Sequence, residues 1–193
     1  MELTTERLSL REFNEYDWPD VLAYQTDSLY LRYSPWTERT PEVVQAFVQV
    51  FLAQQHEQPR SKFQLAIVLK SSHQLIGTCG IRMESADAYE ADIGYELSPT
   101  YWGQGYATEA ARAIVQFGFT ELRVHRIWSW CIADNVGSAR VLEKLGMRPE
   151  GRQREKEYFK GRWWDTLLFA MLDEEWHAQQ QLQGPGQGTQ RTR

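Results

Sequence analysis

The stretch that decides the fold is DIGYELSPTYWGQGYATEA, residues 92–110. It begins as a strand, turns at two glycines, Gly103 and Gly105, and continues directly as a helix. Glycine lets a backbone approach a ligand closely, and the first amides of a helix are unpaired donors at its positive end. The order of strand, glycine turn and helix therefore predicts an anion site suited to phosphate or pyrophosphate. A turn that needs glycine for its geometry alone is the other interpretation, and the flanking strand and helix favour the anion site over it.

Hydrophobic periodicity on both sides of this stretch predicts the remaining elements. Strands are expected over residues 7–13, 63–69, 75–83, 89–97, 126–132, 151–159 and 163–172. Helices are expected from Asp17 to a break at 34–37, from Thr40 onward, over 105–121, and from a cap at Asp134 or Asn135 to Gly146. Consecutive strands favour antiparallel hairpins, and the later alternation favours a parallel crossover. The predicted class is an α+β domain, or three-layer α/β/α, built on a mixed sheet.

Length and composition narrow the class of protein further. The 193 residues fit one domain, expected over 4–174, and the Gln- and Gly-rich tail at 175–193 is predicted to be disordered. A net charge of −5 argues against a nucleic-acid partner. The apolar runs are too short for a bilayer and the first residues lack an export signal, so no membrane partner and a cytoplasmic location are expected. Two isolated cysteines, Cys79 and Cys131, suit neither a disulfide framework nor a metal site.

Several further motifs occur in an order that is typical of one family. They are TERLSLR at 5–11, IGY at 93–95, YWGQGYATEA at 101–110, NVGS at 135–138, LEKLG at 142–146 and GRWWD at 161–165. With these motifs the sequence resembles the GNAT superfamily of acetyl-CoA-dependent N-acetyltransferases, and most of all the RimJ/RimL-like branch of ribosomal-protein N-terminal acetyltransferases. The resemblance covers about residues 4–172. It implies a GNAT-like, mostly antiparallel sheet of about seven strands with helices on both faces.

The resemblance also implies acetyl-CoA as the acyl donor, with no metal. The family's pyrophosphate loop falls on six residues, with Thr108 at the helix start; they are Trp102, Gly103, Gln104, Gly105, Tyr106 and Ala107. Trp102 stands where Gln or Arg is usual, but such a loop works through backbone amides. Leu97 falls where a strand backbone would pair with the pantetheine arm. Asn135 matches the asparagine that holds the cofactor between two splayed strands, and Ser138 follows it by one helical turn.

Acetyl transfer to an amine needs a proton acceptor and a proton donor. Asp92 and Glu96 share one side of a strand, so either can border an amine site as a base, act through water or hold an ammonium group; the alternative is that both are ordinary solvated residues. Many relatives use a tyrosine as donor at the position of Leu142, which cannot donate. Ser138 is the residue this branch offers instead, although it can equally be a capping hydroxyl. Tyr106 and Tyr158 are alternatives.

The acceptor is expected to be a primary amine, and by resemblance a protein N-terminal α-amine. Such an amine is roughly a tenth neutral at pH 7, against about one molecule in 2,500 for a lysine. An amino sugar, a polyamine or an amino-acid derivative is the alternative acceptor, and a non-catalytic acyl-CoA sensor is the alternative function. Trp36, in the loop that breaks the first helix, is the predicted substrate contact. A homodimer is compatible with this branch.

Overall fold

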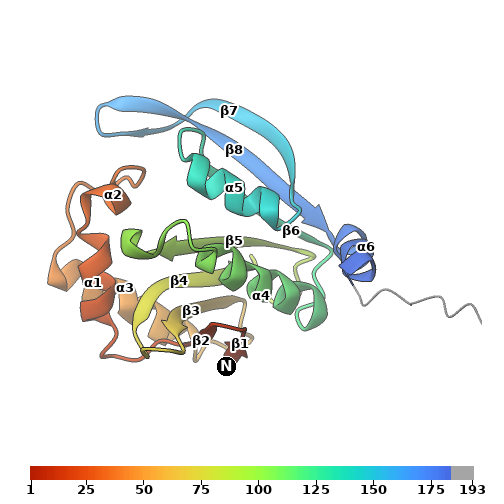
Figure 1. The fold of residues 1–193 in the computed structure, drawn as a ribbon, viewed down its shortest axis with the longest axis horizontal. Helices are drawn as coiled ribbons and strands as arrows, with labels where there is room; N and C mark the ends of the chain where they lie inside the picture. The colour runs from red at the N-terminus through yellow and green to blue at the C-terminus, as the bar shows by residue number, and fades with distance from the viewer. Residues whose placement is uncertain (184–193) are drawn as a thin grey trace, which may run out of the picture.

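Eight strands form one mixed sheet in the computed structural model, which describes residues 1–183 (Figure 1). The strands are β1 (Glu2–Thr4), β2 (Leu8–Glu12), β3 (Lys62–Leu69), β4 (Leu75–Arg82), β5 (Glu90–Leu97), β6 (Arg126–Ile132), β7 (Arg148–Phe159) and β8 (Arg162–Leu172). They lie in the order β1-β2-β3-β4-β5-β6-β8-β7. The β5–β6 pair is parallel and the other pairs are antiparallel. The predicted mixed, mostly antiparallel α+β sheet is thus confirmed.

The eighth strand is β1, which the sequence pattern did not predict. Its three residues are too few for a recognisable alternation, and it is held by pairing along β2, where Leu3 lies opposite Leu10. β1 also begins before residue 4, the expected start of the domain.

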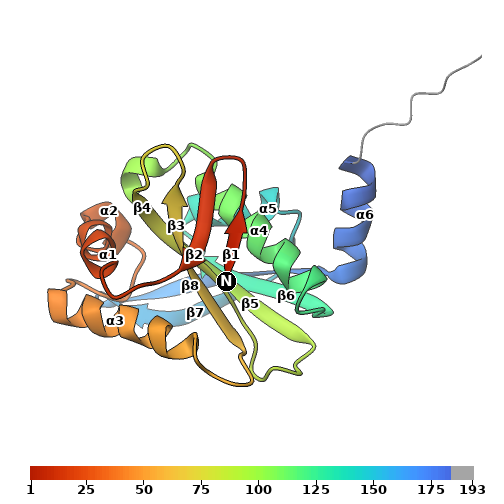
Figure 2. The same ribbon diagram turned by 90° about the horizontal axis from the view of Figure 1, so that it is seen from below.

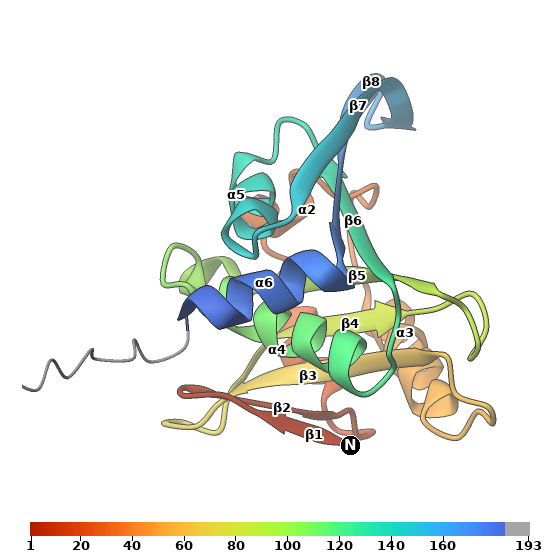
Figure 3. The same ribbon diagram turned by 90° about the vertical axis from the view of Figure 1, so that its right-hand side faces the viewer.

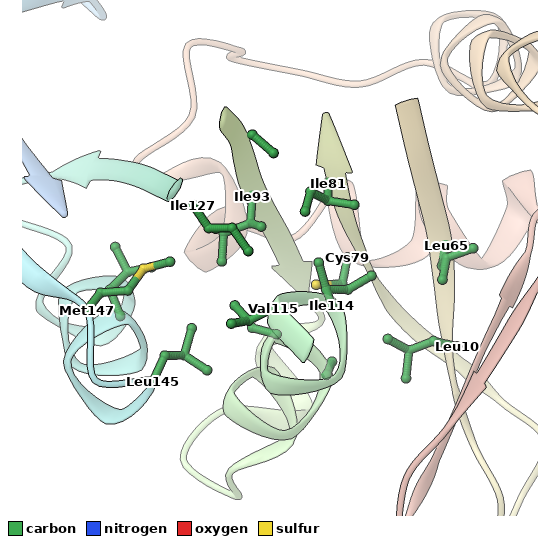
Figure 4. Close-up of a cluster of buried hydrophobic side chains, with 14 of the residues drawn as sticks. Leu10, Leu65, Cys79, Ile81, Ile93, Ile114, Val115, Ile127, Leu145 and Met147 are labelled. Atoms are coloured by element: carbon green, nitrogen blue, oxygen red, sulfur yellow. The ribbon is translucent and has the colours of Figure 1, made fainter. Parts of the chain in front are cut away.

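Helices cover both faces of the sheet, as expected (Figure 2). They are α1 (Trp18–Gln25), α2 (Ser28–Leu31), α3 (Pro41–Gln54), α4 (Tyr106–Thr120), α5 (Val136–Lys144) and α6 (Asp173–Gln183). α1 and α3 pack on one face, where they bury Val21, Val44 and Val48 against Ala66 of β3. α4 packs on the other face, and α5 and α6 lie beside it. In the larger core, Ile114 and Val115 of α4 meet strand side chains such as those of Ile81 and Ile93 (Figure 4).

Local sequence signals set most of the helix ends. Of the two expected caps for α5, Asn135 is the one used: its side-chain oxygen accepts a hydrogen bond from the Ser138 amide at 3.2 Å. Gly146 has φ of 85°, the left-handed conformation expected after a helix end. The helix predicted from Asp17 to residue 34 is instead two helices, because Asp27 accepts a bond from the Leu29 amide and starts α2. Asp17 stands before α1, but its carboxylate binds Arg11 rather than the helix.

The tail expected to be disordered from residue 175 starts instead as the last turns of α6. The Trp176 ring is 8% exposed and lies 5.5 Å from the Phe119 ring of α4, measured between centroids. A single aromatic anchor gives no periodic pattern, which is why the polar composition hid this helix. Residues 184–193 of that tail lie outside the described residues. Through residue 183, no helix is long and apolar enough to cross a membrane.

Candidate active site

The glycine turn between β5 and α4 has the backbone shape that an anion-binding loop requires. Gly103 and Gly105 have φ of 74° and 85°, in the left-handed region that favours glycine. A side chain at Gly103 would meet no atom within 4 Å, so the turn is open on that side. Gly105 is the N-cap residue of α4 and has no side chain to cap the helix. The first amides of α4, from Tyr106 onward, therefore point out of the helix without a side-chain partner.

The same helix end is braced by the loop between β1 and β2. The Glu109 carboxylate accepts hydrogen bonds from the Thr5 hydroxyl at 2.6 Å and from the Arg7 amide and Nε at 2.9 and 2.7 Å. Arg7 also donates to the Gln104 carbonyl at 3.0 Å, and its guanidinium lies 4.2 Å from the centre of the Tyr106 ring. Burial raises the pKa of Glu109, but the bonds from Thr5 and Arg7 outweigh it and the pKa is lowered. Glu109 thus stays ionised and holds the loop to the sheet.

β5 and β6 separate directly behind this turn. Their pairing stops at Asp92 opposite Trp128, whereas β5 stays paired with β4 as far as Leu97 opposite Gly77. Figure 3 shows β6 running away from β5 toward the β7–β8 hairpin. On the β6 side, the Ile93 carbonyl accepts from the Ser129 hydroxyl at 2.8 Å and the Leu97 carbonyl accepts from the Trp102 indole at 2.8 Å. Because alternate residues face the same neighbour, the Tyr95 backbone also faces this opening.

Two hydroxyl groups meet beside the opening. The Tyr95 hydroxyl lies 3.0 Å from the Ser138 hydroxyl and 3.0 Å from the Ser138 carbonyl oxygen. Burial raises the pKa of Tyr95, while the contact with Ser138 acts in the opposite direction. The Ser138 hydroxyl thus contacts a second hydroxyl group, on β5.

Asp92 and Glu96 share one face of β5, as predicted, but their surroundings differ. The Asp92 carboxylate forms an ion pair with Arg82 of β4, with Nε at 2.9 Å. The Arg82 head lies over Gly94, because a side chain there would come within 3.0 Å of an Arg82 nitrogen. Asp92 is thus tied to the neighbouring strand β4.

Glu96 lies in a group of polar side chains on the α1–α3 face, here called the Glu96 cluster, which consists of Tyr24, Gln25, Tyr30, Trp36, Arg39 and Glu96. Its carboxylate accepts from the Gln25 amide at 2.9 Å and the Tyr24 hydroxyl at 3.1 Å. Burial raises the pKa of Glu96, and hydrogen bonds from Gln25, Tyr30 and Tyr24 with the charge on Arg39 offset only part of the rise. The result is a stronger base than an exposed glutamate.

Trp36, the predicted substrate contact, is a member of this cluster. Its ring lies 4.1 Å from the Arg39 guanidinium carbon. Trp36 is thus connected to Glu96 through Arg39 and Gln25, whereas Ser138 lies on the opposite face of β5.

Comparison with known proteins identifies the family. The model of the acetyltransferase (GNAT) domain matches residues 7–148. The chain belongs to the GNAT acetyltransferase family. An uncharacterized N-acetyltransferase of Bacillus subtilis, YnaD, is 37% identical over 177 residues, which are 92% of this chain and 100% of YnaD. A GNAT-family acetyltransferase structure from Bacillus anthracis is 32% identical, covers 91% of this chain and all of its own, and superposes with a TM-score of 0.80. The structure of RimL, a ribosomal L7/L12 α-N-protein acetyltransferase in complex with coenzyme A, shares the fold at a TM-score of 0.78 and 20% identity, covering 89% of this chain and 98% of RimL.

GNAT enzymes use an acyl-CoA, and the residues present here fit one. The open glycine turn and uncapped start of α4 suit a pyrophosphate, and the separation of β5 from β6 leaves strand backbone to pair with an extended arm. The Leu97 carbonyl already accepts a hydrogen bond from the Trp102 indole, so the Leu97 amide is the backbone group left to pair with the extended arm. The Asn135 side-chain oxygen is used in capping α5.

Sequence reasoning missed three features of this candidate site. Tyr95 was readable within IGY, but its contact with Ser138 depends on how α5 packs. Arg7 lies within the N-terminal motif, and its bonds to Glu109 span about half of the chain. Arg39 carries no sequence signal, since nothing near it in the chain marks it as buried.

Proposed function

We propose that this GNAT acetyltransferase moves an acetyl group directly from acetyl-CoA to a primary α-amine, without an acyl-enzyme. The observation that carries the proposal is the placement of Tyr95 and Glu96. They are neighbours on β5 and point to opposite faces of the sheet, at the point where β6 has already separated. A proton donor on the α4–α5 face and a proton acceptor on the α1–α3 face would then flank the strand backbone between them.

In the proposed reaction, the amine nitrogen bonds to the acetyl carbon and the carbon–sulfur bond breaks. The amine loses one proton and the departing sulfur gains one. Glu96 would accept the first proton, directly or through water. The Tyr95 and Ser138 hydroxyls, 3.0 Å apart, would supply the second. A backbone amide near Leu97 would donate to the acetyl oxygen as negative charge develops there.

A protein N-terminal α-amine is the proposed acceptor. Its pKa near 8 leaves a useful neutral fraction at pH 7, so one partly buried glutamate suffices as the base. RimL, which has this fold, acts on such an amine. Small-molecule amines are the competing acceptors.

Release of free thiol, followed with DTNB, tests the proposal across N-terminal peptides, amino acids, polyamines and amino sugars. We expect turnover with α-amines and a loss of about 10²–10⁴-fold in kcat for Glu96→Gln. Asp92→Asn is the matched comparison on the same strand face, and it should lose much less.

Three results would contradict parts of this proposal. A kcat for Glu96→Gln equal to that of the wild type would contradict the assignment of Glu96 as the base. Turnover only with polyamines or amino sugars would exclude an α-amine as the acceptor. Tight acetyl-CoA binding with no turnover on any acceptor would favour an acyl-CoA sensor.

A further inference from the structure

Arg39 is buried in a way that its neighbours do not explain. The residue is 8% exposed and lies in the loop between α2 and α3. Its Nε donates to the Gln25 side-chain oxygen at 2.8 Å, and its guanidinium lies over the Trp36 ring. Within residues 1–183, its Nη2 is the only buried side-chain nitrogen or oxygen without a hydrogen-bond partner.

An unpaired donor of this kind is costly, because a charged group has lost its water and gained no partner. Holding Gln25 requires Nε alone, and stacking on Trp36 requires only a flat side chain. The unpaired Nη2 is therefore the nitrogen left for a ligand oxygen. A carboxylate matches the guanidinium, because it accepts charge-assisted hydrogen bonds from it.

The position of Arg39 relative to Glu96 indicates where that carboxylate would lie. One carboxamide joins the two residues: the Gln25 oxygen accepts from Arg39, and the Gln25 nitrogen donates to Glu96. The Arg39 guanidinium and the Glu96 carboxylate are thus separated by the width of one bridging carboxamide group. A compact ligand with an amine at one end and a carboxylate at the other can reach both.

Charge balance points to the same ligand. Burial raises the pKa of both Tyr24 and Tyr30, so these hydroxyls stay neutral, and Gln25 has no charge. The cluster therefore holds one cation, Arg39, and one acid, Glu96. An incoming ammonium group alone would leave one uncompensated positive charge, whereas an amine that also bears a carboxylate leaves none.

We propose that Arg39 binds a carboxylate of the acceptor, so that the preferred substrate is an α-amine with a carboxylate within a few bonds of it. The proposal rests on the acetyltransferase function proposed above and adds a substrate class to it. Two sources share this chemistry, the α-carboxylate of a free amino acid and the side chain of an N-terminal aspartate.

Matched acid and amide acceptors test this. One pair is a peptide beginning with aspartate against the same peptide beginning with asparagine, and the other is alanine against alaninamide. We expect kcat/KM to be about ten- to a hundredfold higher for the acid in at least one pair, which also identifies the source of the carboxylate. Arg39→Gln should bring that ratio close to one, and Arg39→Lys should keep part of it. Arg32→Gln, an exposed arginine seven residues earlier, should leave the ratio unchanged.

A purely structural role for Arg39 would lower the rates of acid and amide equally, so the ratio separates the two roles. The thermal midpoints of the Arg39 variants show whether they fold. Equal kcat/KM for acid and amide in the wild type, or a preference that Arg39→Gln leaves intact, would overturn the inference. If no acceptor turns over, the proposed function fails, and calorimetry of the same ligand pairs with CoA present still decides whether Arg39 selects the acid.

Discussion

At the scale of single residues, Asp92 and Glu96 show how surroundings separate two identical functional groups. Both are carboxylates on one face of β5. The ion pair with Arg82 ties up Asp92, whereas Glu96 meets neutral donors and has a raised pKa. In our proposal the difference assigns the base to Glu96.

The pH dependence of activity should report the ionisation of Glu96. A base must be deprotonated, so kcat/KM should fall as the pH drops through the raised pKa of Glu96. Tyr24 donates to the ionised carboxylate at 3.1 Å and so lowers this pKa. Tyr24→Phe keeps the ring, removes the bond and should move the acidic limb to higher pH.

The groups that face Glu96 are Gln25, Tyr24, Tyr30 and the charge on Arg39, so Tyr30→Phe should act in the same direction. The matched control is Tyr16→Phe, since that ring is 79% exposed and away from the cluster. The measurement is a pH profile of kcat/KM with one peptide. If the acidic limb of the pH profile stayed in place in both Tyr24→Phe and Tyr30→Phe, a group other than Glu96 would be responsible for it.

At the scale of elements, the loop before α4 is held from outside by the loop between β1 and β2. Arg7→Ala removes the side-chain bonds to Glu109 and to the Gln104 carbonyl but keeps the bond from the backbone amide to Glu109, so the turn loses much of its brace. We expect the dissociation constant for acetyl-CoA to rise about tenfold, with a smaller change in kcat at saturation, because an interaction of this size is worth about 1–3 kcal/mol. Calorimetry and steady-state kinetics measure the two effects.

A glycine comparison tests the same loop independently. Gly105→Ala places a side chain on a residue with φ of 85°, and holding alanine in this left-handed conformation should cost roughly 1–2 kcal/mol. The loop should then leave the shape that binds acetyl-CoA, and the affinity for acetyl-CoA should fall. The control is Gly151→Ala in β7, where an added carbon meets nothing within 4 Å. If both variants bound acetyl-CoA as the wild type does, the phosphate-loop assignment would be wrong.

At the scale of the whole molecule, the last described helix ties the C-terminal end to α4. The Trp176 side chain is the buried part of α6, and it packs on Phe119. Trp176→Ala should lower the free energy of unfolding by about 3–5 kcal/mol, as large aromatic truncations in a core do. Urea unfolding measures this loss.

Leu182→Ala is the matched control on the same helix, since Leu182 is 87% exposed and should change stability by no more than about 0.5 kcal/mol. Equal stability of both variants would mean that α6 does not contribute to the folded core. Turnover well below the melting temperature should be similar in both, because α6 lies away from the Glu96 cluster.

The sequence by itself determined seven of the eight strands, most helices and the glycine turn, because these depend on alternation, helical spacing and capping, which are local. It also singled out Asp92, Glu96 and Ser138 as candidate site residues, through strand alternation and motifs that are short and contiguous. It could not show how the surroundings of the two acids differ, because Arg82 and Gln25 reach them from other elements. Only the tertiary structure decided that Tyr95 meets Ser138, that Arg7 braces the start of α4, and that Arg39 is buried with one nitrogen unpaired. Those contacts join residues far apart in the chain, and burial of a charge depends on packing that no local pattern records.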